Sequence, residues 1–525
     1  MAAEYEIIAA QLLRVNSRNH AAWNNWGVGI FNEALELPDD VSAPLFEEAT
    51  RKYAIAADLA PREPLYWQNW GGVLLQQAIR ATDEKKLSFF QDACLKYERA
   101  VRLRPGWHSH WWNLGTCYLE WAKRTDVKLA DPLYYEAYVR YAVVAEILEP
   151  HNLKAWFDWG GALLTHAARL DGAESVPLFM EASEKFERCC KDRVNRGDAL
   201  NNGAVALIEL AKRLPDVPGA KLWLANAESK LTDAISLSPD NALYWFNRGT
   251  VRYSQARNSV FADKKRLLAE ADAEMVIAHR LNPDPHATLI NWGNIDAELA
   301  SLAGTDAESI TLLREAEAKY SAAIAKEPGI PMYWINWGVL YLRLAMDAEP
   351  EQAITHCEEA CAKYIVANGL QPDNFEALIG WSETLTFQAK HTTDDVGFAD
   401  LLSRAEEKAE RAMRLKPESF MPYNINGLIG TRRAVRESDA DKRNVLLENA
   451  VENLRKSNEI KPNKATFALA RIAAIKGNTV ECRRLLEDAE AHDVLLVPRQ
   501  LARDEDLLSV RDEEWFRQLL ERLPR

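Results

Sequence analysis

Residues 328–367 read PGIPMYWINWGVLYLRLAMDAEPEQAITHCEEACAKYIVA, and this stretch decides the fold. After its first proline, aromatic residues recur at steps of three and four, at Trp334, Trp337 and Tyr341, which is the period of a helix with one buried face. Proline starts a helix readily and cannot continue a preceding one. A second periodic stretch, with alanines around a tyrosine, follows a polar connection. The stretch therefore predicts two helices.

The same pattern recurs along the chain of 525 residues. A small residue closes a Trp- and Asn-rich segment every 43 to 46 residues, at Gly27, Gly71, Gly115, Gly160, Gly203, Gly249, Gly293, Gly338, Ser382 and Gly427. A proline precedes eight of these by ten residues, at Pro61, Pro105, Pro150, Pro239, Pro283, Pro328, Pro372 and Pro417. An Ala-x3-(Tyr/Phe/Leu)-x2-Ala pattern ends five residues before several of the prolines. These landmarks predict a repeat protein of about ten units.

The motifs resemble the tetratricopeptide repeat, a helix-turn-helix unit in which an aromatic residue, a glycine, two alanines around an aromatic and a proline follow one another. The resemblance implies an all-α protein, an α-solenoid whose repeats wind as a right-handed superhelix. We expect a capping helix in residues 1–16, about ten elongated repeats in residues 17–462, and a diverged terminal repeat with a helical cap in residues 463–525.

Each unit exceeds the ordinary repeat of about 34 residues. The interval from the small residue to the first alanine of the second helix is 22 residues, as from Gly27 to Ala49 and from Gly338 to Ala360. The surplus therefore lies between the first helix and its partner. It either lengthens both helices or forms a long polar loop, such as ELPDDVSAP at residues 36–44, and the sequence leaves both alternatives open.

Composition and charge exclude several classes of protein. A hydrophobic content of 48% and a charged content of 27% describe a folded, globular chain. The 78 acidic and 64 basic side chains give a net charge of -14, which argues against nucleic acid or an anionic membrane as the partner. The sequence has no run of eighteen apolar residues and no signal peptide at its start. Seven cysteines, an odd number, fit reduced thiols and predict a cytoplasmic protein.

Signals for catalysis are weak. We find no Gly-rich phosphate loop, nucleophile elbow or metalloprotease helix. His108 and His110 lack partners at metal-ligand spacing, and Cys357 and Cys361 replace alanines of the second helix, where a cysteine acts as a small apolar residue. We therefore predict a protein that is not an enzyme, with no cofactor, no metal and no small-molecule substrate.

The residue two positions before the small residue is the main candidate for binding. A side-chain amide offers both a donor and an acceptor, so a row of amides can pair with the backbone of an extended peptide. The row resembles the asparagine ladder of the O-GlcNAc transferase repeat domain, which grips peptide backbone in its concave groove. The alternative is that these side chains bond to neighbouring helices. The row consists of Asn25, Asn69, Asn113, Asp158, Asn201, Asn247, Asn291 and Asn336.

Aromatic and apolar residues accompany this row. The residue three positions before the small residue is Trp112, Phe157 and Phe246 in three of the units, and Leu or Ile in others. Such a strip would supply pockets for apolar side chains of a bound segment. The alternative is that the lengthened helices bury it. The tryptophans four positions and one position before the small residue are expected to pack in the core.

Taken with the resemblance, these patterns predict a scaffold or adaptor that binds a segment of another protein in its concave groove. The alternative is a regulatory subunit that docks onto a separately encoded effector enzyme, for example a protease or a nuclease.

Overall fold

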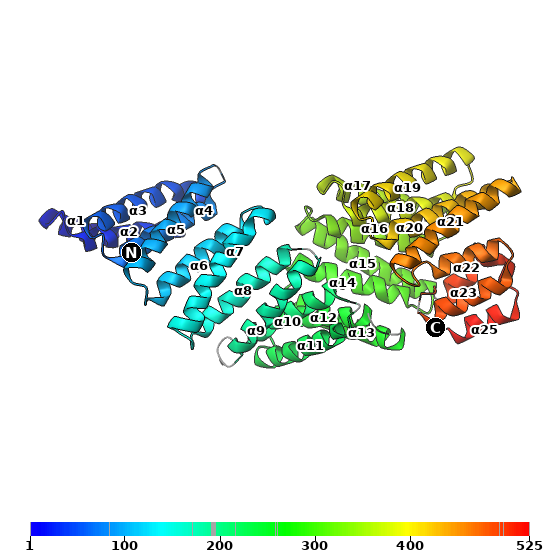
Figure 1. The fold of residues 1–525 in the computed structure, drawn as a ribbon, viewed down its shortest axis with the longest axis horizontal. Coiled ribbons are helices and arrows are strands. Elements are labelled where there is room, and N and C mark those ends of the chain that lie inside the picture. The colour runs from blue at the N-terminus through cyan, green and yellow to red at the C-terminus, as the bar shows by residue number, and fades with distance from the viewer. Residues whose placement is uncertain are drawn as a thin grey trace. The chain divides into compact units, whose positions relative to one another are not determined.

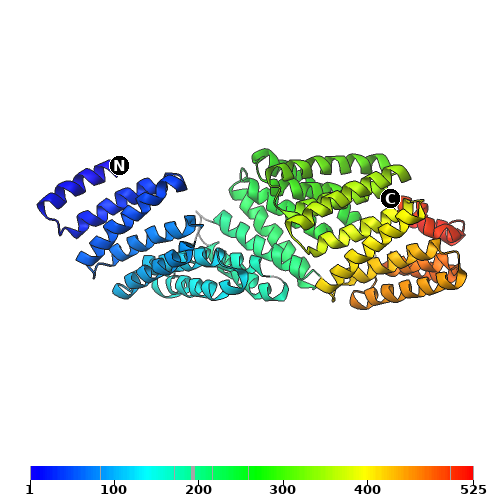
Figure 2. The same ribbon diagram turned by 90° about the horizontal axis from the view of Figure 1, so that it is seen from above.

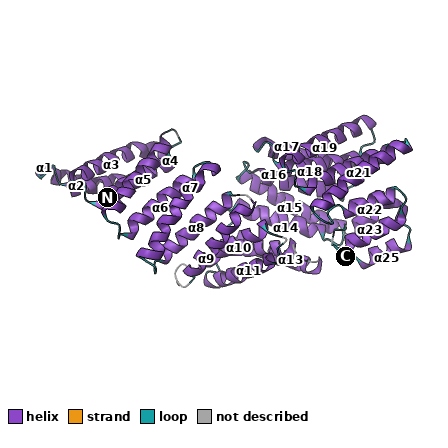
Figure 3. Ribbon diagram, in the orientation of Figure 1, coloured by secondary structure: helices purple, strands orange, loops and turns teal. Residues whose placement is uncertain are grey.

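The computed structural model describes residues 2–82, 84–170, 172–190, 196–215, 217–257, 259, 261–492, 494–496 and 498–523. Helices make up all the regular structure within these ranges, which confirms the predicted all-α class (Figure 3). They follow one another in consecutive pairs (Figures 1 and 2). The chain divides into two compact units, Met1–Pro239 and Asp240–Arg525, here called the N-terminal and the C-terminal unit. The predicted repeat array of residues 17–462 is therefore shared between two units.

In the N-terminal unit, one helix precedes five helix pairs. The preceding helix, α1 (Ala2–Val15), packs on α2. The pairs are α2 (His20–Leu35) with α3 (Asp39–Leu59), α4 (Pro64–Arg80) with α5 (Lys85–Leu103), α6 (His108–Lys123) with α7 (Val127–Ala142), α8 (Leu153–Arg169) with α9 (Val176–Cys189), and α10 (Arg196–Arg213) with α11 (Gly219–Leu237). A π-helical segment, η1 (Val143–Leu148), continues α7, and a short 3-10 helix, η2 (Gly172–Ser175), precedes α9.

The C-terminal unit continues the same pairing. Its pairs are α12 (Ala242–Arg257) with α13 (Phe261–Leu281), α14 (His286–Ser301) with α15 (Asp306–Lys326), α16 (Pro331–Met346) with α17 (Pro350–Leu370), α18 (Phe375–His391) with α19 (Asp395–Leu415), α20 (Phe420–Arg436) with α21 (Ala440–Ile460), and α22 (Thr466–Ile475) with α23 (Thr479–Ala491). The chain then forms α24 (Pro498–Arg503), η3 (Glu505–Val510) and α25 (Glu514–Arg522).

The extra residues of each repeat lengthen its two helices. First helices such as α2 and α4 have 16 and 17 residues, and second helices such as α3 and α17 have 21. The alternative of a long polar loop is wrong, because most of the segment 36–44 belongs to α3, which begins at Asp39 and contains Pro44. Asp39 and Ser42, polar residues that suggested a loop, lie in the first turn of this helix.

In most repeats the small residue allows close contact between the paired helices. A Cβ atom added to Gly27 would lie 3.0 Å from Cε1 of Tyr53, and one added to Gly338 would lie 2.7 Å from Cζ of Tyr364. Both tyrosine side chains are buried. The second-helix aromatic ring thus lies directly against the backbone of the first helix, and glycine leaves the space that this ring fills.

In five repeats, the tryptophan four residues before the small residue fixes the turn before its helix. Its indole N–H donates a hydrogen bond to the carbonyl oxygen six residues earlier, which is a proline carbonyl in most units. The N···O distances are 2.7 to 3.3 Å at Trp23, Trp67, Trp111, Trp156 and Trp334. This bond explains the constant interval between the proline and the tryptophan, because both belong to one turn.

The tryptophan one residue before the small residue stacks on the first tryptophan. Its ring also makes a cation–π contact with a lysine. The ring centroids of Trp67 and Trp70 are 5.7 Å apart, and the Lys96 ammonium lies 3.9 Å from the centroid of Trp70. This cation–π contact recurs with Lys52 on Trp26, Lys185 on Trp159 and Lys363 on Trp337. The core packing predicted for the tryptophans is therefore partial, since most of them are half-buried and stacked beneath a lysine.

A buried histidine joins α7 and α8. The Tyr138 hydroxyl donates to Nδ1 of His166 at 2.7 Å, and Nε2–H of His166 donates to Oδ1 of Asp131 at 2.9 Å. The ring stacks on Tyr134 with centroids 4.2 Å apart. This pattern suits the neutral imidazole with its proton on Nε2. Burial lowers the pKa of His166 below its ordinary value of 6.5, although Asp131 opposes the shift.

We expect the N-terminal unit to lose stability on acidification. Because the pKa of His166 is lower in the folded than in the unfolded chain, the unfolded chain takes up the proton first as the pH falls below 6.5. The contribution of neutral His166 to the free energy of unfolding is therefore fully present above pH 6.5. It is lost as the pH falls through the pKa that His166 has in the folded chain. Urea unfolding at about pH 7.5 and about pH 5 should show a smaller drop for His166→Gln than for the wild type. The exposed His151, changed to Gln, should keep the full drop.

Candidate binding face on the first helices

The predicted binding residues lie in the first helices, where consecutive repeats meet. Within each unit, the first helix of one repeat also contacts the first helix of the next, as α2 contacts α4 and α14 contacts α16. Residues two and three positions before the small residue occupy the middle of these helices. Their side chains can therefore either bond across this contact or face outward.

Three asparagines form a hydrogen-bonded chain between α2 and α4. Nδ2 of Asn69 donates to Oδ1 of Asn24 at 2.9 Å, and Nδ2 of Asn24 donates to Oδ1 of Asn25 at 3.2 Å. Asn24 is buried, Asn69 is half-buried and Asn25 is exposed. Asn24, which sequence reasoning did not select as a site residue, holds the two predicted side chains together. The sequence did contain a signal for this role of Asn24. Asn69 follows it 45 residues later, one repeat along, and a buried amide needs a hydrogen-bond partner of this kind.

Trp112 and Asp158 join α6 to α8 in a second polar group. The indole N–H of Trp112 donates to Oδ2 of Asp158 at 2.8 Å, and the Lys154 ammonium donates to the same oxygen at 3.3 Å. The ammonium also lies 4.5 Å from the centroid of the Trp112 ring. Burial raises the pKa of Asp158, and Lys154 and the Trp112 bond oppose this rise. The group presents a cation, a carboxylate and a half-buried indole on one face.

The rest of the predicted row is less uniform. Asn113 and Asn336 are half-buried, whereas Asn201 and Asn247 are buried. Asn291 donates to Oγ1 of Thr250 at 3.1 Å, which links α14 to α12. Bonds to a neighbouring first helix are thus found for several members of the row, as the structural alternative expected.

The apolar strip also divides into two kinds of residue. Leu200, Ile290 and Ile335 are buried between helices. Phe157 and Phe246 are half-buried. The ring of Phe157 meets Phe186 edge-on with centroids 5.5 Å apart, and Phe246 packs on the core that α12, α13 and α14 share. The rings of the strip therefore remain partly accessible, while its aliphatic members belong to the core.

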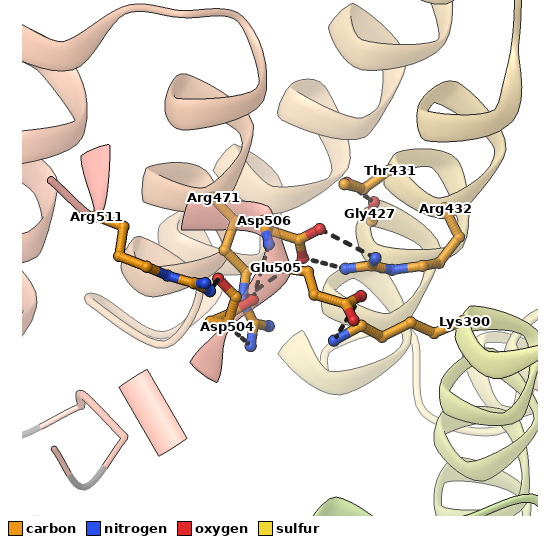
Figure 4. A network of polar contacts seen from close by, with 9 residues as sticks. All are labelled: Lys390, Gly427, Thr431, Arg432, Arg471, Asp504, Glu505, Asp506 and Arg511. Atoms are coloured by element: carbon orange, nitrogen blue, oxygen red, sulfur yellow. Dashed lines mark hydrogen bonds and ion pairs between the residues drawn. The ribbon is translucent and has the colours of Figure 1, made fainter. Parts of the chain in front are cut away.

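A third polar group, which sequence reasoning missed, joins the first helices α20 and α22 of the C-terminal unit to residues 504–506 (Figure 4). Arg432 of α20 makes a two-bond ion pair with Asp506, in which Nη1 donates to Oδ1 at 3.0 Å. Arg471 of α22 pairs with Asp504 at 2.6 Å. The side chains of Asp504 and Asp506 are only 3% and 4% exposed, so both carboxylates are buried. Burial alone would raise the pKa of Asp506, but Arg432 and the neighbouring cations lower it overall.

Signals for chemistry at this face are few. Within the described ranges, no three His, Cys, Asp or Glu side chains are grouped as a metal site. Burial raises the pKa of Cys357 to about 12 and that of Cys361 to about 11, which disfavours the reactive thiolate. Of the helices that the structure describes, none combines the length and the apolar character needed to span a bilayer.

Comparison with known proteins gives matches among solved structures only. No known family and no curated protein matches the sequence. The human IFIT1 dimer with PPP-AAAA is 14% identical, covers 81% of this chain and 91% of its own, and has a TM-score of 0.42. Yeast Tom70 is 13% identical over 93% of this chain and 99% of its own, with a TM-score of 0.32. The Cut9-Hcn1 hetero-tetramer of the APC/C is 11% identical over 95% and 96%, with a TM-score of 0.36.

These similarities concern the fold alone. The motif repeats in one phase with the helix pairs of both units, and most pairs have the contact between the first-helix glycine and a side chain of the second helix. The consecutive pairs confirm the α-solenoid, whereas the right-handed superhelix stays a prediction. In its motif and its helix pairs, this chain resembles the tetratricopeptide repeat, with longer helices.

Proposed function

We propose that the chain is a non-enzymatic scaffold or adaptor that binds a segment of another protein along the first helices of its N-terminal unit. The observation that carries this proposal is the polar surface formed by the Asn24, Asn25 and Asn69 chain and by the Trp112 and Asp158 group. Amides that are already ordered by one bond can pair with a peptide backbone at little entropic cost.

The N-terminal unit is favoured because most of its candidate residues remain accessible, Asn201 excepted. Asn25 is exposed, and Asn69, Asn113 and Asp158 are half-buried beside the half-buried Trp112 ring. In the C-terminal unit, Asn247 and Asn291 serve contacts within the fold, so we assign them a structural role. The net charge of -14 supports a protein partner over a nucleic acid, because repulsion opposes the approach of a polyanion.

We expect the triple variant Asn25→Ala, Asn69→Ala, Asn113→Ala to lose binding. Each lost amide removes about 1 kcal/mol of hydrogen bonding, so affinity should fall about 100-fold. Affinity purification from the native source with mass spectrometry would identify the partner, and calorimetry would then measure its affinity for the wild type and the variant.

The matched control replaces exposed amides on second helices, Gln91→Ala and Asn226→Ala. Its affinity should equal that of the wild type. Equal affinity of the triple variant, with unchanged circular dichroism, would show that the partner binds elsewhere. The same purification separates the alternative function, because a regulatory subunit would leave gel filtration as a stoichiometric complex with its effector enzyme, and a peptide-binding scaffold would release its segment.

A further inference from the structure

The segment of residues 498–510, here called the C-terminal segment, crosses several repeats of the C-terminal unit. Nε2 of Gln500 donates to Oδ1 of Asp347 at 2.9 Å, and Arg503 pairs with Asp306 at 2.9 Å. The Lys390 ammonium lies 3.5 Å from Glu505. The residues that the segment contacts lie in successive repeats, at intervals of 41 to 43 residues: Asp306, Asp347, Lys390 and Arg432. The segment therefore follows the stacking direction and meets one side chain in each repeat.

This segment has an apolar side and an acidic side with different partners. Leu501, Leu507 and Val510 are buried in the cluster formed with α22 and α23, which closes the terminal repeat. The acidic side carries Asp504 and Asp506, and the latter reaches back to α20 of the preceding repeat. The apolar side covers the end of the core together with Phe516 and Leu519 of α25. The acidic side needs another explanation, because a buried ion pair often adds little net stability compared with apolar packing.

The basic residues are arranged to receive carboxylates. Arg432 is 12% exposed and presents two N–H groups in parallel to one carboxylate, which is the geometry of specific carboxylate recognition. Arg471 contacts both Asp504, at 2.6 Å, and Asp506, at 3.8 Å. Both guanidinium groups are only partly exposed, at 12% and 22%, so an anion between them offsets the repulsion of two like charges that water screens incompletely. The two arginines therefore favour an acidic segment at this position.

We propose that Lys390, Arg432 and Arg471 form a binding site for an acidic peptide segment, and that residues 504–506 occupy it as an intramolecular ligand which a partner's acidic segment replaces. This site would extend the proposed function. It rests on that function in one respect only, that the partner is a segment of another protein. It assigns a second site, in the C-terminal unit, that uses cations in place of amides.

An acidic peptide suits the site better than a nucleic acid. The present occupant consists of carboxylates spaced along a peptide backbone, and Arg511 also donates to the backbone carbonyl oxygen of Asp504 at 3.2 Å. Long polyanions are repelled by the net charge of the chain. The basic side chains thus bind both the carboxylates and the backbone of one peptide segment.

The test uses a fluorescent peptide that copies residues 498–511, PRQLARDEDLLSVR, and the full chain. In the Asp504→Asn, Asp506→Asn variant of the chain, we expect the peptide to bind about tenfold more tightly than to the wild type, because an occupied site lowers apparent affinity by the fraction that is open. Adding Arg432→Gln and Arg471→Gln should abolish this binding. A peptide with asparagine in place of its two aspartates should not bind.

A second variant covers the case in which the first does not fold. Gln500→Ala, Arg503→Ala, Glu505→Gln removes the contacts to Asp347, Asp306 and Lys390 but keeps both buried ion pairs. It should bind the peptide about threefold more tightly than the wild type.

Three outcomes would overturn the inference: no peptide binding to either folded variant, binding that survives loss of both arginines, or equal displacement by a single-stranded DNA of the same charge. These results are independent of the Asn25, Asn69 and Asn113 variant. The acidic site can therefore fail while the scaffold function stands.

Discussion

Changing Gly160 to leucine is expected to destabilise the N-terminal unit by about 3 kcal/mol. A Cβ atom at this position would lie 3.0 Å from Cε1 and Cζ of Phe186, whose side chain is fully buried. The remaining leucine atoms would push α9 away from α8, and neither helix can move without losing contacts to its neighbours. Urea unfolding should show the loss, and hydrogen exchange should place it in peptides from α8 and α9.

The adjacent glycine provides the control. A Cβ atom at Gly161 would meet nothing within 4 Å, so Gly161→Ala should stabilise the helix by about 0.5 to 1 kcal/mol. The two neighbours therefore have opposite predicted signs. If Gly160→Leu were tolerated as well as Gly161→Ala, the close contact with Phe186 would not be what makes the small residue necessary at that position.

Changing Arg432 to alanine is expected to destabilise the C-terminal unit by about 3 kcal/mol. The variant leaves the buried Asp506 carboxylate with the longer, 3.8 Å contact to Arg471. A carboxylate that has lost its main partner must either stay charged in a poor environment or take up a proton, and both cost free energy. Thermal unfolding followed by circular dichroism would measure the loss, and hydrogen exchange should increase in the C-terminal segment.

Arg433 is the matched control for this prediction. It lies next to Arg432 in α20 and pairs with Glu406 by two bonds, but its side chain is 36% exposed. Arg433→Ala should therefore cost no more than about 1 kcal/mol. Equal effects of the two substitutions would mean that burial of the Asp506 pair has no special weight.

The repeating features of the fold were predictable from the sequence, because each is local. Proline, tryptophan and glycine lie within one helix and its preceding turn, as Pro328, Trp334 and Gly338 do. Their constant intervals report bonds and contacts that the structure shows. The choice between longer helices and longer loops was not decided, because polar residues such as those after Asp39 suit an exposed helix turn as well as a loop.

The candidate site was predicted in part. Period alone places Asn25 and Asn247 at equivalent positions, yet one is exposed and the other buried, since exposure depends on the neighbouring repeat. The lysines on the tryptophan rings follow a pattern that was visible, a lysine just before the second-helix aromatic, as in Lys52 and Tyr53. The contact of the acidic residues with α20 joins positions 74 apart and has no counterpart in the repeat pattern.

The C-terminal segment changes how the C-terminal unit should fold. In a linear array each repeat touches only its neighbours, so the last repeat can fray alone and stability is a sum of nearest-neighbour contributions. Here Gln500 is bonded to Asp347, 153 residues earlier, which closes a long loop of chain. Closing such a loop costs entropy that is recovered only when all the intervening repeats are in place. We therefore expect cooperative unfolding of this unit and slow folding, in contrast to the gradual fraying of an open-ended array.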